Sequence, residues 1–141
     1  MPYRFVEDVS LADVAFEATG KTLEELFESA AIAVTHTMVR DVKSVSQKIK
    51  KDFVVKSDKI DMLLFNFLQE IIFYKDAERL LFSKFDIKVN MKPLEASCTA
   101  HGEELDMKRH ELVVDVKAVT LHKFGVEQTE DGWRAEVVLD I

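Results

Sequence analysis

The sequence contains little cysteine, glycine or proline, and each scarcity excludes a class of protein. Cys98 is the only cysteine, so we expect no internal disulfide and no cage of thiolate metal ligands. Four glycines and two prolines in 141 residues exclude collagen-like and proline-rich disordered chains. No apolar run reaches membrane-spanning length, and residues 1–10 lack the basic and apolar regions of a signal peptide. We therefore expect a cytoplasmic protein without a membrane partner.

The composition predicts one compact globular domain, residues 1–141. Hydrophobic residues make up 48% of the chain, enough to bury a substantial core. The formal net charge of −7 argues against broad binding to a phosphate backbone, which needs a surface rich in lysine and arginine. Lys48, Lys50 and Lys51 form a small basic run, which is most often a solvated segment and indicates at most a weak contact with RNA or an acidic partner. Strong direct binding of tRNA is therefore not expected.

Two stretches have apolar residues at helical spacing. Thr22 can cap the first helix, and Glu25, three residues later, completes a capping box. The second helix is predicted to begin after Ser57 or Asp58 and to continue to about Lys75. Its apolar stripe is wide, which predicts contact with more than one neighbouring element.

The other apolar stretches alternate with polar residues, which predicts strands. The candidate strands are residues 3–7, 14–18, 52–57, 81–92, 95–101, 114–122 and 133–141. The last two are expected to form a C-terminal hairpin, joined by a polar connection that contains Gly125 and Glu130-Asp131-Gly132. Helices come early and strands dominate late, which favours an α+β fold with a mainly antiparallel sheet packed with two principal helices.

The chain stops inside the last predicted strand, although chain ends usually fray. Ending at Asp140-Ile141 places the Asp140 side chain and the terminal carboxylate side by side. Asp13 precedes the predicted strand 14–18 in an acid-rich loop, where a carboxylate is usually a solvated turn residue. If that strand lies near the last one, three anions meet and need a counter-ion, for which all-oxygen ligands favour Ca²⁺ or Mg²⁺ over Zn²⁺. Composition alone leaves both interpretations open.

An enzyme is the alternative hypothesis. Histidines beside carboxylates can act as acids and bases, although ordinary polar histidines explain His101, His110 and His122 as well. A small metal-dependent phosphoester hydrolase would use Asp13 and Asp140 as ligands and His110 or His122 as its base. No motif of a nucleophile or of a phosphate-binding loop is present to support it.

Three stretches together resemble the archease family, small proteins that serve as cofactors of the RtcB-type tRNA-splicing RNA ligase. They are residues 5–34 (FVEDVSLADVAFEATGKTLEELFESAAIAV), 109–122 (RHELVVDVKAVTLH) and 131–141 (DGWRAEVVLDI). Each stretch alone is weak evidence for the family, but their order and positions in the chain are specific. The resemblance covers the whole chain. It implies a single α+β domain whose acidic N-terminal loop lies next to the C-terminus.

The resemblance also implies a function. The protein would be a non-enzymatic activator that promotes guanylylation and multiple turnover of the RtcB-type ligase in tRNA splicing and RNA repair. A chaperone or adaptor for other RNA-processing enzymes is a further possibility. A divalent metal with calcium-like preferences, Mg²⁺ or Mn²⁺ also being possible, would be held by Asp13, Asp140 and the carboxylate of Ile141. The candidate partner contacts carried over from the family's motifs are Arg109, His110, Lys117 and His122.

The first loop departs from the family pattern. The family usually has Glu-His-Thr-Ala-Asp, whereas residues 7–13 are Glu-Asp-Val-Ser-Leu-Ala-Asp, so the histidine and threonine are missing and the segment is longer. Asp13 is kept, and we therefore expect cation binding to be kept. The shape of the loop and the role of the missing histidine stay open at this point.

Overall fold

The structure, a computed structural model, describes residues 2–6 and 13–141. Its elements in chain order are β1 (Tyr3–Val6), β2 (Asp13–Gly20), α1 (Leu23–Met38), the 3₁₀ helix η1 (Val42–Ser44), β3 (Ile49–Lys56), α2 (Ile60–Glu78), β4 (Leu80–Met91), β5 (Leu94–Glu104), β6 (Ala118–Thr129) and β7 (Gly132–Asp140). The strands form two antiparallel sheets, with orders β1-β2-β7-β6 and β3-β5-β4. The predicted α+β fold, its antiparallel pairing and its C-terminal hairpin are confirmed, whereas the division into two sheets was not predicted.

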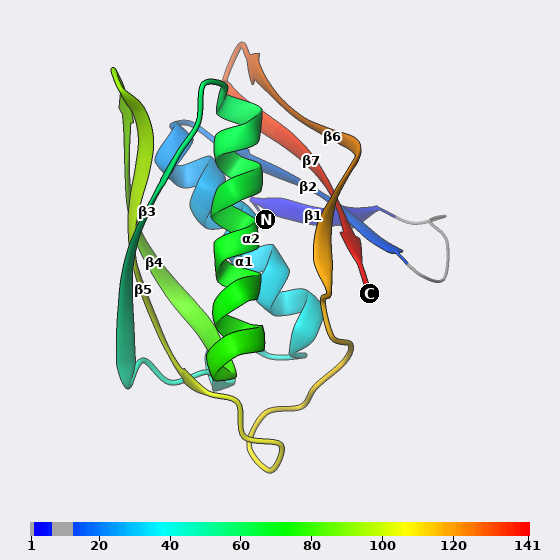
Figure 1. Cartoon of the computed structure of the whole chain (residues 1–141). Coiled ribbons are helices and arrows are strands. Elements are labelled where there is room, and N and C mark those ends of the chain that lie inside the picture. The colour runs from blue at the N-terminus through cyan, green and yellow to red at the C-terminus, as the bar shows by residue number, and fades with distance from the viewer. Residues whose placement is uncertain (1, 7–12) are drawn as a thin grey trace.

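Both helices lie between the two sheets (Figure 1). Helix α1 packs on β2 of one sheet and β4 of the other, and α2 packs on β6 and on all three strands of the second sheet. The wide apolar stripe of α2 was therefore correctly predicted to contact more than one element. Burial on several sides explains why Leu26, Phe27 and Val34 of α1 and Phe67 of α2 are completely inaccessible to solvent. No helix in the described part of the chain combines the length and apolar character needed to cross a membrane.

The start of α1 agrees with the prediction, and the start of α2 does not. Thr22 caps α1, because its side chain accepts a hydrogen bond from the Glu25 N–H (3.1 Å), while the Glu25 carboxylate accepts from Lys21 N–H (2.7 Å). Helix α2 begins after Lys59, which makes no side-chain cap bond. Ser57 instead accepts from the Lys59 N–H (3.4 Å), so its hydroxyl closes the turn before the helix.

The C-terminal hairpin is tighter than predicted. Strand β6 continues to Thr129, so Gly125 lies within the strand opposite Glu136 and is not part of the connection. Residues 121–124 form a bulge that shifts the register before Gly125. At the turn, Gly132 has φ +148°, and a Cβ atom there would lie 2.3 Å from the carbonyl oxygen of Gly20, so a larger residue is excluded by both conformation and space.

Candidate metal-binding site at the junction of the first and last strands

The structure brings Asp13 and Asp140 together. Strands β2 and β7 pair antiparallel, with Asp13 directly opposite Asp140. Residues paired in this way project from the same face of a sheet, with Cβ atoms about 4.5–5.5 Å apart. Phe16 and Val137 of the same strand pair are buried against the helices, and side chains alternate along a strand. The two aspartates therefore lie on the face turned away from the helices.

The end of the chain is held in place. The side chain of Ile141 is half-buried and packs against the core, and the carbonyl oxygen of Asp140 accepts a hydrogen bond from the Lys117 N–H (2.8 Å). Strand β7 lies between β2 and β6 (Figure 1), and on the β6 side Ala118 is opposite Asp140. A methyl group is thus the cross-strand neighbour on that side, and it leaves room around the Asp140 carboxylate.

Two side chains of α2 fix the segment beside Asp140. The buried ammonium of Lys75 donates to the Asp115 carboxylate (2.5 Å) and to the Val116 carbonyl oxygen (2.6 Å). The Gln69 side-chain oxygen accepts from the Val119 N–H (2.9 Å). Residues 114–117 were predicted as strand, and this was wrong because these contacts with α2 take the place of strand pairing.

Sequence reasoning did not identify Lys75, although a signal was present. Lys75 follows Ile71 by four residues and Ile72 by three, and thus continues the buried stripe of α2. A lysine at such a position needs acceptors within the fold, because a buried ammonium without partners is strongly unfavourable. Besides the neighbouring Asp76 (2.6 Å), its acceptors are Asp115 and Val116, about 40 residues away, and these became visible only in the folded chain.

The donor set fits a hard divalent cation. Asp13 and Asp140 offer carboxylate oxygens, and the terminal carboxylate of Ile141 would add two more oxygens, the ligand type that Ca²⁺ and Mg²⁺ prefer. Among the described residues, no three His, Cys, Asp or Glu side chains form a group that could hold a metal ion, and the terminal carboxylate of Ile141 is the candidate for a third ligand. Like charges directly opposite each other weaken a sheet, and a divalent cation between them would turn repulsion into attraction.

Lys117 and His122 both lie on the surface, but only Lys117, whose N–H binds the Asp140 carbonyl oxygen, is shown beside this site. Both side chains are exposed, Lys117 next to the partner strand of Asp140 and His122 in the bulge of residues 121–124. Leu121 of the same bulge is 63% exposed. The structure therefore leaves Lys117 and His122 accessible to a partner that approaches the end of β7.

Arg109 and His110 belong to a different cluster, centred on the buried carboxylate of Glu103. This carboxylate accepts hydrogen bonds from Arg109 Nη1 (2.6 Å), Ser46 N (2.6 Å) and His110 Nε2 (3.0 Å). The Nδ1 atom of His110 accepts from the Asp106 N–H (2.9 Å), so the imidazole proton is on Nε2. His110 is only 2% exposed, which corrects the expectation of a surface position, whereas the Arg109 side chain is 43% exposed.

Glu103 makes the protein sensitive to acid. The hydrogen bond from Arg109, with further bonds from Ser46 and His110, lowers the pKa of Glu103 to about 2. A depressed carboxyl pKa stabilises the fold above the pKa of the unfolded state, and this stability is lost as the pH falls from about 4.5 towards 2. We expect Glu103→Gln to cost on the order of 2–3 kcal/mol at neutral pH and to flatten the acid limb.

Urea unfolding at a series of pH values measures this effect. Glu95→Gln is the matched control, because it removes a partly exposed carboxylate of the same strand, β5, which lies 4.0 Å from Lys56 of β3, and it should leave the acid limb unchanged. If the free energy of unfolding fell equally for Glu103→Gln and the wild-type protein between pH 5 and pH 2, Glu103 would not be the source of the acid sensitivity.

The described residues offer little chemistry for a hydrolase. Both ring nitrogens of His110 are used within the Glu103 cluster, so His110 is not available as a base beside Asp140. Burial, with Asp86 and Asp52 nearby, raises the pKa of the Cys98 thiol to about 12. The thiol is therefore protonated at neutral pH and is not a nucleophile.

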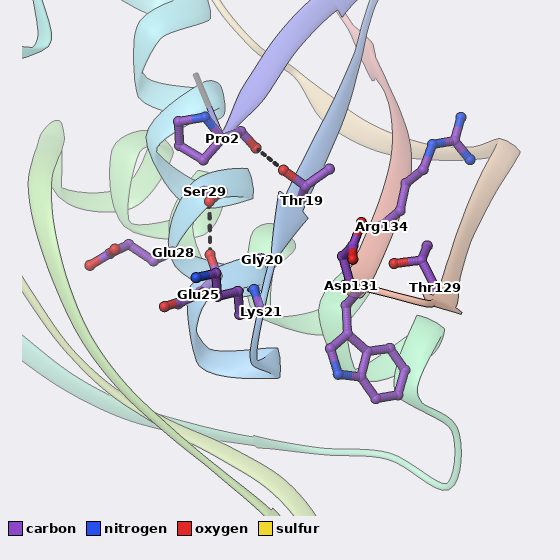
Figure 2. Close-up of a pocket in the computed structure, with 11 residues that line it drawn as sticks. Pro2, Thr19, Gly20, Lys21, Glu25, Glu28, Ser29, Thr129, Asp131 and Arg134 are labelled. Carbon is purple, nitrogen blue, oxygen red and sulfur yellow. Dashed lines mark hydrogen bonds between the residues drawn. The ribbon is translucent and has the colours of Figure 1, made fainter.

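A groove lies at the opposite end of β2 and β7 (Figure 2). It has a volume of about 570 Å³ and separates the start of α1 from the hairpin turn. Several of its polar groups are used within the fold: Thr19 donates to the Pro2 carbonyl oxygen (3.3 Å), Ser29 donates to the Glu25 carbonyl oxygen (2.8 Å), and Arg134 pairs with three glutamates. The groove thus lacks the convergent polar groups of a catalytic pocket.

Comparison with known proteins points to one family. A model of the archease protein family matches residues 3–141. Protein archease of Pyrococcus abyssi is 37% identical over 133 residues, covering 92% of this chain and 93% of that protein, and protein archease of Methanosarcina acetivorans is 32% identical over 142 residues, covering 99% and 95%. The solution structure of Methanobacterium thermoautotrophicum protein 1598 has a TM-score of 0.86 with 37% identity and covers 99% of both chains. A Thermotoga maritima archease, described as a possible chaperone, has a TM-score of 0.63 over 98% of both chains with 18% identity, and shows the shared fold alone.

Proposed function

The chain belongs to the archease family, and from this premise we propose that it is a non-enzymatic activator of the RtcB-type tRNA-splicing RNA ligase. The activator would promote guanylylation of the ligase and its repeated turnover in tRNA splicing and RNA repair. The observation that carries the proposal is the pairing of Asp13 with Asp140, next to Ile141, on the open face of the β1-β2-β7-β6 sheet.

In this proposal the three carboxylates hold a divalent cation, Ca²⁺ in preference to Mg²⁺ or Mn²⁺. The ion would neutralise the carboxylates and fix the end of β7 in the orientation that meets the ligase. Lys117 would contact the ligase beside the ion, since it is exposed and its N–H binds the Asp140 carbonyl oxygen, and His122 would contact it from the exposed bulge of residues 121–124. With or without a bound cation, the three carboxylates offer anionic oxygens that can adjust metal or nucleotide occupancy at the ligase active site. Cytoplasmic location agrees with this role and is part of the proposal.

Multiple-turnover ligation by the cognate ligase, at known concentration of active sites, tests the proposal. With RNA in excess, we expect product to stop near one equivalent per ligase without this protein and to continue well beyond it when the protein is added. The guanylylated fraction of the ligase, followed with labelled GTP, should rise in parallel. Unchanged turnover and guanylylation would contradict the proposal.

The same assay separates the two alternatives. A chaperone would increase the amount of active ligase recovered after heating without changing turnover per active site. A hydrolase would release product from phosphodiesters in the absence of ligase, and chelation would stop it. His110, one of the two candidate bases, is used within the Glu103 cluster, and this favours the activator over the hydrolase.

A further inference from the structure

The charges of the chain are separated between two sides of the molecule. Residues 40–56 and 79–110, which contain the β3-β5-β4 sheet and its loops, have twelve lysines and arginines against seven aspartates and glutamates, a formal net charge of +5. The rest of the sequence has seven against nineteen, a formal net charge of −12. The β3-β5-β4 sheet lies across the helix layer from the sheet that contains Asp13 and Asp140 (Figure 1). A protein of net charge −7 therefore has one cationic side.

The centre of this side is the solvent-facing surface of the β3-β5-β4 sheet. Side chains alternate along its strands, so that Phe53, Phe85 and Cys98 are buried and their neighbours face outwards. We name the outward basic residues the cationic face: Lys50 and Lys56 of β3, Lys84 and Lys88 of β4, and His101 of β5 between them. Three carboxylates also face outwards among them, and these are Asp52, Asp86 and Glu95.

Its basic groups are arranged in register, and three of its four lysines form no ion pair among the described residues. Lys50 and Lys84 are both opposite His101, so three basic residues form a row across strands about 4.8 Å apart. Within the described part of the chain, Lys50, Lys84 and Lys88 form no ion pair, and only Lys56 and His101 have carboxylates within 4.0 Å. An anionic ligand would supply counter-charges to the lysines that have no carboxylate partner.

The chemistry of the face indicates what kind of anion it binds. Among the outward positions of residues 50–56, 84–90 and 95–101, Val54 is the one apolar residue and no aromatic residue is present. Protein interfaces have an apolar centre rich in aromatic residues, and recognition of unpaired bases needs aromatic stacking. Lysines on a rigid sheet suit phosphate oxygens, which position a nucleic acid without reading its sequence.

We propose that the cationic face binds the phosphodiester backbone of RNA, weakly and without sequence preference. This inference concerns the isolated protein and does not depend on the activator function or on the metal. From the total charge alone, only weak binding of tRNA was expected. The separation of charges agrees with weak binding and assigns the contact with RNA to one side of the molecule. Asp13 and Asp140 remain accessible on the other side, so one molecule can contact RNA and a protein at the same time.

Fluorescence anisotropy with a labelled single-stranded RNA of mixed sequence, over a series of potassium chloride concentrations, tests the inference. We expect binding at low salt that weakens as salt rises. The double variant Lys84→Gln/Lys88→Gln should bind roughly tenfold more weakly, with a salt slope smaller by about 1.4, because two phosphate contacts are lost. The control Lys21→Gln/Lys59→Gln changes the net charge equally at exposed lysines outside the face and should bind like the wild-type protein.

Other occupants of the face give different results. No binding at low salt, or an equal loss in both double variants, would overturn the proposal. Tighter binding of polyglutamate than of RNA would assign the face to an acidic protein partner. A salt-sensitive dimer in sedimentation velocity that Lys84→Gln/Lys88→Gln abolishes would assign it to a second copy of the chain. Circular dichroism of each variant establishes that the fold is kept.

Discussion

Asp140→Asn is expected to abolish calcium binding and, with it, stimulation of the RNA ligase. The substitution keeps the size of the side chain and its place opposite Asp13 but removes one of the negative charges offered to the cation. Affinity for Ca²⁺ depends steeply on the number of charged ligands, and we expect a loss of roughly a hundredfold or more. Asp13→Asn should have the same effect from the opposite strand. Isothermal titration with Ca²⁺ and multiple-turnover ligation measure the two consequences.

The control for this experiment lies on the same strand and the same face. Glu136 is four residues before Asp140, and Glu136→Gln changes the net charge equally. Arg134 keeps its contacts with Glu17 and Glu127, so the local ion pairs survive. Calcium binding by Glu136→Gln should therefore be unchanged. Full stimulation by Asp140→Asn would contradict the proposed role of the site, whatever its calcium affinity.

An extension of the C-terminus tests the third ligand separately. A few added residues after Ile141 displace the terminal carboxylate but leave Asp13 and Asp140 paired. We expect weaker calcium binding, because three ligands become two. Wild-type affinity of the extended protein would remove Ile141 from the site and leave the two aspartates as its ligands.

Gly102→Ala is expected to cause a large loss of stability, because Gly102 has the shortest Cβ contact of the four glycines. A Cβ atom at Gly102 would lie 1.8 Å from the carbonyl oxygen of Leu81 and 2.8 Å from Cα of Phe82, and both are backbone atoms that a rotamer change cannot move. Strand β4 is irregular between Phe82 and Lys84, where it passes closest to Gly102. Separating the strands would break ladder hydrogen bonds at the centre of the β3-β5-β4 sheet. We expect a cost of about 3 kcal/mol or more.

Gly125→Ala is the matched control. Gly125 is also a strand glycine, but a Cβ atom there would have no neighbour within 4 Å. The substitution should change the free energy of unfolding by less than about 0.5 kcal/mol. Urea unfolding followed by circular dichroism measures both variants, and equal stabilities would show that β4 and β5 separate at little cost.

Local sequence patterns predicted most elements and missed some of their limits. The Thr22 cap and the alternation of strands such as residues 81–92 depend on neighbours within a few residues, so they are legible in the sequence. The start of β6, by contrast, was not predicted correctly. Lys75 binds Asp115 and Val116 from another part of the chain, and this contact removed residues 114–117 from the predicted strand. Distant partners of this kind leave no periodic pattern.

The candidate site was predictable in part. The family resemblance and the strand-like chain end pointed to Asp13, Asp140 and Ile141, and the register of β2 with β7 confirms that Asp13 and Asp140 are neighbours. Arg109 and His110 were predicted as partner contacts on their motif alone. The structure instead places them around Glu103, whose role had no counterpart in the sequence analysis.

The sequence alone determined the α+β class, the family and the residue types of a possible cation site, because propensities, caps and motifs act over short distances. Tertiary structure alone decided that Asp13 is opposite Asp140, that His110 is buried, and that charge is separated across the helix layer. The physical reason is that strand register and the partners of long polar side chains are set by packing between segments far apart in the chain. A net charge of −7 is a sum over the sequence, whereas the cationic side exists only because two segments of the chain fold into one sheet.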